Sequence, residues 1–155
     1  MIRDKVKASI RNDISPILCV GETDHERKED MTKRVIHDQV TTALSNLTAR
    51  EVINLVIAYE PVWAIGSGDP AKPQQIEEAV QCVRHNVSEL YGSKVGSALR
   101  VIYGASVEPE FVAGILSLDG VDGLLAGGAS LNPYKFANII EAAYRLQAGD
   151  SNEDR

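Results

Sequence analysis

The sequence is poor in aromatic residues and lacks long basic or apolar runs, and each shortage excludes a class of protein. Aromatic residues make up only 5% of the 155 positions, too few for the stacking platforms that bind single-stranded nucleic acid. The net charge is −6, and no lysine- or arginine-rich stretch offers a surface for a nucleic acid. The apolar runs are far shorter than the roughly 20 residues that span a bilayer. We therefore expect neither a nucleic acid nor a membrane as a partner.

Cysteine is also scarce, and its two positions point to a reducing compartment. Cys19 falls in an expected strand and Cys82 on an expected helix face, so we expect both to be buried free thiols. Neither has metal-ligand spacing with the three histidines, and we expect no metal site. The N-terminal stretch MIRDKVKASI alternates charged and aliphatic residues, unlike a signal peptide. Together these features predict a cytoplasmic domain of ordinary globular composition.

The sequence does contain a regular alternation of apolar strands and amphipathic helices. Apolar, β-prone runs predict four strands, at Pro16–Val20, Leu55–Tyr59, Arg100–Tyr103 and Gly123–Ala126. Helical spacing of apolar residues predicts helices at Asp4–Arg11, Thr32–Leu47, Pro73 to about Leu90, Pro109–Leu116 and Pro133–Leu146. The last helix is expected to bury a stripe formed by Phe136, Ile139, Ile140 and Ala143.

Strands that each lead into a helix indicate a parallel sheet covered by helices, which is the α/β class. Right-handed crossovers allow such units to roll into a barrel or to spread as an open doubly wound sheet. Neither a GxGxxG motif after the first strand nor a Walker A lysine is present, so a nucleotide-binding open sheet has little support. Residues 1–147 are expected to form one domain, followed by a polar tail at 148–155. The first expected helix has no strand before it, as though the chain began in the middle of a repeat.

The segment VIAYEPVWAIGSG, at residues 56–68, is the most informative stretch of the chain. Pro61 biases Glu60 toward an extended conformation, so we expect its carboxylate at the C-terminal tip of a strand, where parallel α/β folds hold their chemistry. The glycines of GSG give the following loop unusual backbone freedom, and Trp63 and Ile65 give it apolar mass. This pattern predicts a lidded active site in which Glu60 is the general base.

Three glycine-containing segments at successive strand ends have the composition of phosphate cradles. They are GSG at 66–68, YGAS at 103–106 and AGGAS at 126–130. Adjacent glycines let a dianion approach the backbone amides closely, and a helix N-terminus adds positive charge. Loops after the last two strands hold a phosphate in many (βα) barrels. One such segment would be ordinary turn chemistry, whereas three in succession predict a phosphate site.

Other polar residues near the strand ends have simpler interpretations. Glu22 follows the first strand, and we expect a structural carboxylate that binds loop amides. His25, His37 and His85 are expected to be solvated or to cap helices rather than to catalyse. The sequence shows no Ser–His–Asp arrangement and no cysteine nucleophile with a partner histidine.

Four strings, PILCVGET, YEPVWAIGSG, VIYGASV and VDGLLAGGASL, occur in an order and at intervals that resemble the second half of triosephosphate isomerase. The likeness runs from about Asp4 to Leu146. It implies the (βα)8 TIM-barrel family, present here as a four-unit parallel half-barrel equivalent to barrel strands five to eight. It also implies an enzyme of glycolysis and gluconeogenesis, which interconverts dihydroxyacetone phosphate and D-glyceraldehyde 3-phosphate without a metal or cofactor.

The resemblance also assigns roles to individual residues. Glu60 matches the family's catalytic base, which shuttles a proton between two substrate carbons. The positions that match its phosphate-binding groups are Gly66, Ser106, Gly127 and Gly128. The positions that match its lid are Pro61, Val62, Trp63, Ala64, Ile65, Gly66, Ser67 and Gly68. Ile65 and Leu125 match the apolar residues that clamp over the base.

Three departures from the family pattern bear on what the chain can do. Ser67 stands where the family has the threonine of GTG. Ala105 replaces the second glycine of YGGS, and its methyl group is expected to crowd the phosphate or to demand a different backbone angle. The family's first-strand Asn and Lys, its fourth-strand His and the loop that makes most of its dimer contact have no counterpart here.

Three hypotheses therefore stand side by side. The first is that the chain is an isomerase. The second is that it is a C-terminal fragment, either a truncated gene product or a half-barrel that needs a complementing N-terminal half. The third is a half-barrel that binds phosphate weakly without catalysis. The family is homodimeric, and a four-stranded half-barrel has two open edges. These features predict self-association or pairing with a complementing half.

Overall fold

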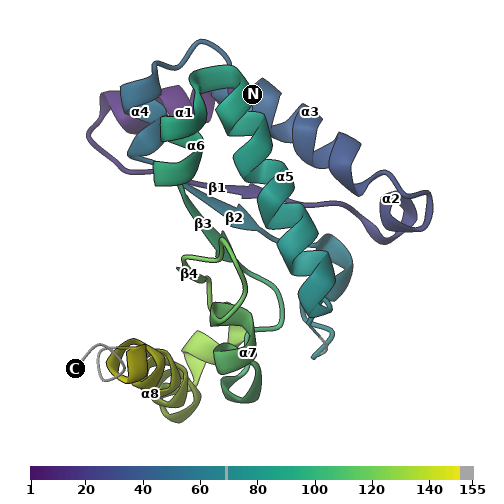
Figure 1. The fold of residues 1–155 in the computed structure, drawn as a ribbon, viewed down its shortest axis with the longest axis vertical. Helices are drawn as coiled ribbons and strands as arrows, with labels where there is room; N and C mark the ends of the chain where they lie inside the picture. Colours follow the sequence, from purple (N-terminus) through teal and green to yellow (C-terminus); the bar gives the residue numbers. More distant parts are fainter. Residues whose placement is uncertain (69, 151–155) are drawn as a thin grey trace.

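The computed structural model describes residues 1–68 and 70–150 and contains one four-stranded sheet (Figure 1). The strands lie side by side in chain order, β1 (Ile17–Val20), β2 (Val56–Tyr59), β3 (Arg100–Tyr103) and β4 (Gly123–Leu124). All neighbouring strands pair in parallel. This confirms the α/β class and the four-unit parallel half-barrel. β4 ends before the expected Ala126, where the chain turns into its glycine pair.

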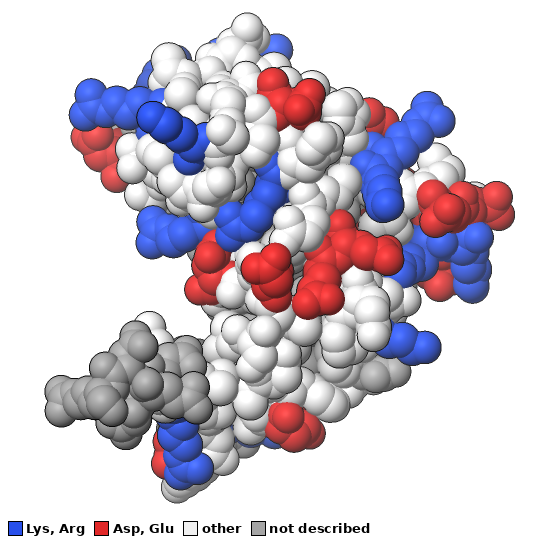
Figure 2. Space-filling view, in the orientation of Figure 1, with Lys and Arg blue, Asp and Glu red and all other residues white. Residues whose placement is uncertain are grey.

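Helices connect the strands and cover one face of the sheet (Figure 1). In chain order they are α1 (Ile2–Arg11), α2 (Asp24–Lys28), α3 (Thr32–Leu44), α4 (Ala49–Ile53), α5 (Pro73–Tyr91), α6 (Ser93–Ala98), α7 (Val112–Leu116) and α8 (Pro133–Asp150). Short 3₁₀ turns lie at Val62–Ala64, Pro109–Phe111 and Gly128–Leu131. No helix in the described part of the chain is long and apolar enough to cross a membrane. Figure 2 shows basic and acidic side chains interspersed over the helix-covered face.

The short helices α2, α4 and α6 are too brief to show as an apolar repeat in the sequence. Two of them carry a different signal. α2 begins with a capping box formed by Thr23 and Glu26, and α4 with one formed by Thr48 and Glu51. In each box the side chain of one residue bonds the backbone amide of the other. The Thr-x-x-Glu spacing thus predicts where both helices start.

Two helix ends differ from the expected bounds. α3 stops at Leu44, before the expected Leu47, because Asn46 adopts a left-handed φ of 61° that interrupts a right-handed helix. α8 continues through Asp150, beyond the expected Leu146. The remainder of the expected polar tail, residues 151–155, lies outside the described residues.

The two faces of the sheet differ in exposure. The face under the helices is buried, and its side chains are Leu18, Val20, Ile57, Tyr59, Val101 and Tyr103. On the opposite face, called the inner face below, Ile17 is 50% exposed, and Cys19 and Arg100 are exposed as well. The expectation of a buried Cys19 is therefore wrong, because its strand face is not covered by the helices. Cys82, on α5, is half-buried.

α8 leaves much of its apolar stripe uncovered. Ile139 is buried, but Phe136 is 39% and Ile140 54% exposed, so the expectation that both are buried is wrong. α5 packs on two strands, β2 and β3, whereas α8 follows the last strand and packs on α7 and on the nearby 3₁₀ turns. A groove of about 790 Å³ lies between α8 and β4. α8 thus packs mainly on a helix and turns, where α5 packs on two strands of the sheet.

Arg84 ties α5 to the elements around it. Its guanidinium donates hydrogen bonds to Leu99 O at 2.8 Å, to Gly120 O at 2.9 Å and to the Asp122 carboxylate at 2.5 Å. The same carboxylate oxygen accepts a hydrogen bond from Val101 N at 2.6 Å. One side chain therefore holds the α6–β3 junction and the turn before β4 against α5.

We expect the isolated chain to self-associate at micromolar concentration. β1 and β4 are the edges of the described sheet, and unpaired strand edges bind other strands. The exposed inner face adds apolar surface, whose removal from water is worth about 25 cal/mol per Å². Sedimentation velocity, read beside near-ultraviolet circular dichroism, measures the outcome. A compact monomer that unfolds cooperatively would contradict this expectation.

Candidate active site

The parallel register brings one residue from each strand end into a single row. The strands end at the same level of the sheet. The residues that follow them form the strand-end row, Gly21, Glu60, Gly104 and Leu125. Their amides continue the ladder, since Glu60 N donates to Val20 O at 2.8 Å and Gly104 N to Tyr59 O at 3.0 Å. Glu60 therefore lies at the tip of β2, where the sequence predicts it, with a glycine on each side.

Glu60 is half-buried and has close neighbours on the inner face. A β-carbon added to Gly104 would lie 2.9 Å from Glu60 Cγ and 3.0 Å from its Oε1. The Cys19 thiol lies near enough to the Glu60 carboxylate to interact with it. Partial burial, followed by the hydrogen-bonding and charge interactions with Glu60, raises the pKa of Cys19 to about 12. The thiol therefore stays protonated at neutral pH beside the carboxylate.

The expected lid leaves β2 at Pro61 and forms a short 3₁₀ turn before its glycines. Gly66 and Gly68 have left-handed φ angles of 69° and 76°, which side chains disfavour. The two residues expected to clamp the base differ in their surroundings. Leu125 is half-buried beside Gly104, whereas Ile65 is 53% exposed.

Glu22 fastens the first part of the lid to the sheet. It is fully buried and accepts hydrogen bonds from Trp63 Nε1 at 3.0 Å, Tyr59 Oη at 3.2 Å and Arg27 Nη1 at 3.2 Å. The Arg27 guanidinium also lies 5.6 Å from the Trp63 ring, a cation–π distance. Burial and the Glu22 charge raise the pKa of Tyr59, which keeps its hydroxyl protonated as a donor. Glu22 is a structural carboxylate as expected, but side chains, not loop amides, bind its oxygens.

Two hydroxyl groups tie the far end of the lid to β3 and its loop. Ser106 Oγ donates to Ala64 O at 2.6 Å and accepts from Gly68 N at 3.2 Å. Tyr103 Oη accepts from Ala71 N at 2.9 Å. Ser106 has a left-handed φ of 45°, a conformation that costs a non-glycine residue about 1–3 kcal/mol. Its hydrogen bonds to the lid, which include a contact of 3.3 Å with Ser67 Oγ, offset part of that cost.

The glycines expected to bind phosphate have open space beside them. A β-carbon added to Gly66, Gly127 or Gly128 would meet no atom within 4 Å, and all three residues are exposed. Ala105 is 2% exposed and packs in the hydrophobic core. Its methyl group therefore lies in the core, and the effect of Ala105 on phosphate binding stays a prediction. Ser106 joins the lid directly, whereas the glycine pair follows β4.

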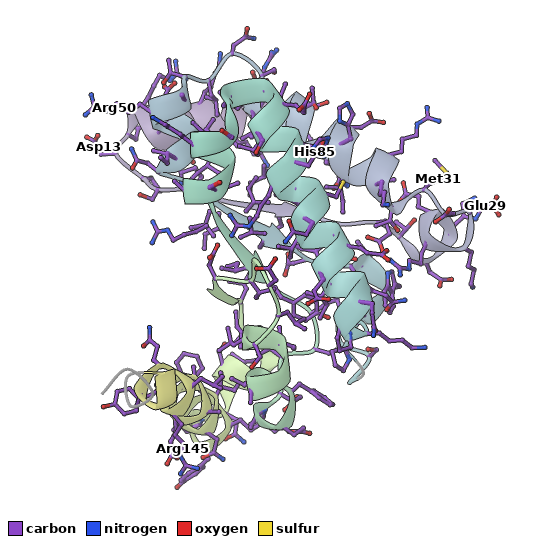
Figure 3. All side chains as sticks on the ribbon, viewed as in Figure 1. Asp13, Glu29, Met31, Arg50, His85 and Arg145 are labelled. Atoms are coloured by element: carbon purple, nitrogen blue, oxygen red, sulfur yellow. The ribbon has the colours of Figure 1, made fainter. Side chains whose placement is uncertain are left out.

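The histidines lie away from the strand-end row. His25 is exposed, and His85 is exposed on α5 (Figure 3). His37 Nδ1 lies 2.9 Å from Asn86 Oδ1, a contact that links α3 to α5. Asp13 and Arg50 mark the opposite end of the strands (Figure 3). Within residues 1–68 and 70–150, no group of three or more histidine, cysteine, aspartate or glutamate side chains could hold a metal ion.

Sequence reasoning missed Tyr103 and Cys19 as contributors to the site, and it missed the hydrogen bond from Trp63 of the expected lid to Glu22. Tyr103 and Trp63 both offered a signal for these bonds, because a buried hydroxyl or indole N–H needs a hydrogen-bond partner. Cys19 shares the inner face with Glu60, since side chains of a strand alternate between the two faces. Strand alternation combined with the register predicts that contact, but the register itself is not visible in a single apolar run.

The fold and the strand-end row define a protein of the parallel (βα)-barrel class, with a carboxylate, a lid and glycine loops at one edge of the sheet. A profile of the triosephosphate isomerase family matches residues 1–143. The chain belongs to the triosephosphate isomerase family.

Individual relatives agree with this assignment. A triosephosphate isomerase from Caldanaerobacter subterraneus subsp. tengcongensis is 40% identical over 140 residues, which is 90% of this chain and 56% of the relative. The enzyme of that name from Carboxydothermus hydrogenoformans is 41% identical over 143 residues, or 92% of this chain and 57% of the relative. The one from Syntrophotalea carbinolica is 45% identical over 140 residues, with shares of 90% and 56%. The chain spans little more than half the length of these relatives.

We expect the two lid ties to protect different amides. Ser106→Ala removes the acceptor of Gly68 N, so that amide should exchange with solvent at least about tenfold faster, while Ala71 N stays protected. Tyr103→Phe removes the acceptor of Ala71 N, so the amide of Ala71 should exchange faster while that of Gly68 stays protected. Hydrogen exchange followed by NMR measures both amides. Equal loss at both amides in either variant would show that the lid end opens as one unit and that the ties are not separate.

Proposed function

We propose that the chain supplies the base, the lid and the phosphate loops of a triosephosphate isomerase, as the C-terminal half of the barrel. The observation that carries this proposal is the strand-end row, in which a half-buried Glu60 stands between two glycines at the root of a glycine-ended lid. Membership of the family supports the assignment of substrate. The two unpaired cysteines fit a reducing compartment such as the cytoplasm, where glycolysis and gluconeogenesis take place.

In the proposed reaction the Glu60 carboxylate takes a proton from the hydroxymethyl carbon of dihydroxyacetone phosphate and leaves an enediolate. It returns the proton to the neighbouring carbon, while the hydroxyl proton on the first carbon passes to the oxygen of the second, and D-glyceraldehyde 3-phosphate results. No atom is gained or lost, and the chemistry requires no cofactor. The high pKa of Cys19 suits this role, because a protonated thiol does not compete with the carboxylate for the substrate proton.

The phosphate group would be bound by the amides of Gly66, Gly127 and Gly128 and by Ser106. The open space at these glycines leaves room for it. The lid would close over the reacting carbons and exclude water, with Ile65 and Leu125 as its apolar contacts to the base. Closure would bury Ile65, which is now 53% exposed.

The active form would combine this chain with a complementing N-terminal half. Charge that develops on the substrate oxygens needs positioned donors, and the family's Asn, Lys and His are not among the motifs of this chain. Glu60 lies on the inner face, beside Cys19. No layer covers this face, so residues such as Ile17 are exposed there. A second half-barrel would cover that face and the two sheet edges together. Without it, weak phosphate binding is the alternative activity of the same loops.

We expect the isolated chain to show isomerase activity at least about four orders of magnitude below that of a full-length relative. Loss of one positioned electrophile costs about 10²–10³ in rate, and loss of the lysine removes charge complementarity as well. A coupled assay on protein from a host without its own isomerase measures this.

The same assay tests complementation. Addition of the N-terminal half of the Syntrophotalea carbinolica relative should raise the activity, and Glu60→Gln should remove the increase. Glu29→Gln is the matched control, because Glu29 is exposed just after α2 (Figure 3). Activity of the isolated chain within tenfold of the full-length enzyme, abolished by Glu60→Gln, would show that no complementing half is needed.

We expect glycerol phosphate to bind the isolated chain with a dissociation constant of about 1 mM or weaker, since the lysine is missing and the lid is not anchored by a second half. An NMR titration measures the affinity and the amides that shift. Ser106→Ala combined with Gly128→Asp should abolish binding, whereas Gly114→Asp, at an exposed glycine of α7 with open space around it, should not. Binding that survives the double substitution would place the phosphate elsewhere.

A further inference from the structure

Both neighbours of Glu60 in the strand-end row are glycines, and neither is needed for its backbone angles. The glycines with a left-handed φ are Gly66, Gly68, Gly92 and Gly120, a set that includes neither Gly21 nor Gly104. A left-handed φ therefore does not explain glycine at these two positions. Glycine is needed there because another part of the chain approaches its α-carbon too closely for a side chain.

Glu60 occupies the space in both cases. A β-carbon on Gly21 would lie 2.0 Å from Glu60 O and 2.5 Å from its carbonyl carbon. A β-carbon on Gly104 would lie 2.9 Å from Glu60 Cγ, 3.0 Å from Oε1 and 3.1 Å from Leu125 Cβ. Gly21 therefore meets the backbone of the base, and Gly104 meets its side chain.

A third residue holds Gly21 from the helix side. The Gln39 side chain, on α3, accepts a hydrogen bond from Gly21 N at 2.8 Å and donates one to Gly21 O at 3.1 Å. One amide group thus binds both backbone groups of the glycine. Since Gly21 is packed against the Glu60 carbonyl, α3 is linked to the base through a single residue.

We propose that Gly21 and Gly104 are positioning residues for the Glu60 base, and that Gln39 fixes Gly21 against it. Glu60 would be held at its backbone by the first glycine and at its carboxylate by the second. This inference rests on the proposed role of Glu60 and deepens it. It concerns where the carboxylate lies, so it can be tested without turnover.

The thiol of Cys19 reports the position of the carboxylate, because the Glu60 carboxylate lies near it on the inner face and raises its pKa. The chain has two cysteines, so Cys82→Ser leaves Cys19 as the single target of an alkylating reagent. In this background, Glu60→Gln should speed alkylation by iodoacetamide at pH 8 by about threefold or more. The reason is that loss of the adjacent carboxylate charge increases the thiolate fraction. We define the Glu60 effect as the alkylation rate of Cys19 with Glu60→Gln divided by the rate without it.

The proposal predicts that Gly104→Ala changes the Glu60 effect by at least about twofold, because the added methyl group displaces the carboxylate from its place beside the thiol. Gln39→Met, which removes both hydrogen bonds to Gly21 at similar volume, should change it as well. Gly114→Ala is the matched control and should leave it unchanged, since a β-carbon there meets nothing within 4 Å. Gly21→Ala should prevent folding, so the other two variants carry the test.

An unchanged Glu60 effect in folded Gly104→Ala and Gln39→Met chains, judged by circular dichroism and thermal unfolding, would overturn the proposal. The proposal would also be overturned if Glu60→Gln left the alkylation rate of Cys19 unchanged, because the thiol and the carboxylate would then not be in contact. Failure of the proposed isomerase appears in the coupled assay and leaves the thiol measurement untouched, so the two failures are distinguishable.

Discussion

The register between the four parallel strands is the constraint on which the rest of the molecule depends. Because the strands end level with one another, Gly21, Glu60, Gly104 and Leu125 fall into one row. A shift of one residue between two strands would move every side chain of one strand to the other face. Glu60 would then lie under the helices, and Tyr59, which binds Glu22 from the buried face, would point into solvent. The site and the core therefore depend on the same pairing.

The helices cover only one face of this sheet, and they cover it unevenly. α5 lies on two strands and is well buried, whereas α8 follows the last strand and leaves Phe136 and Ile140 exposed. On the inner face, Ile17 and Cys19 are also exposed because no layer covers them. Glu60 belongs to this inner face through its contact with Cys19. The surface that lacks a covering layer is thus the surface on which the candidate base lies, and this links the stability of the half-barrel to its chemistry.

Much of the fold could be predicted from the sequence, because each strand is a short apolar run and each long helix carries a regular stripe. The position of Glu60 could be predicted because Pro61 restricts the residue before it. Burial could not be predicted in the same way. Cys19 and Ile140 are apolar enough for a core, and only the absence of a neighbouring layer, a property of the whole sheet, leaves them exposed.

The candidate site was predictable where local sequence determines conformation, and not where distant segments meet. The glycines of the lid follow from left-handed backbone angles that favour them. The partners of Glu22 come instead from a helix, a strand and the lid, and the tie from Ser106 to Ala64 joins residues 42 positions apart. Such contacts require the register and the crossovers to be known first.

The lid is held at its two ends by different chemistry, and this difference decides which end can move. Near β2, Trp63 donates to the fully buried carboxylate of Glu22, whose other donors are Tyr59 and Arg27. Breaking that contact would leave a buried carboxylate with fewer donors, which is costly. At the far end, the hydroxyl of Ser106 bonds Gly68 N, which water could satisfy because Gly68 is exposed, and the carbonyl of Ala64, which also accepts hydrogen bonds from Ser67. The glycine end should therefore open more readily than the tryptophan end, and it is the end at which Gly66 has open space beside it.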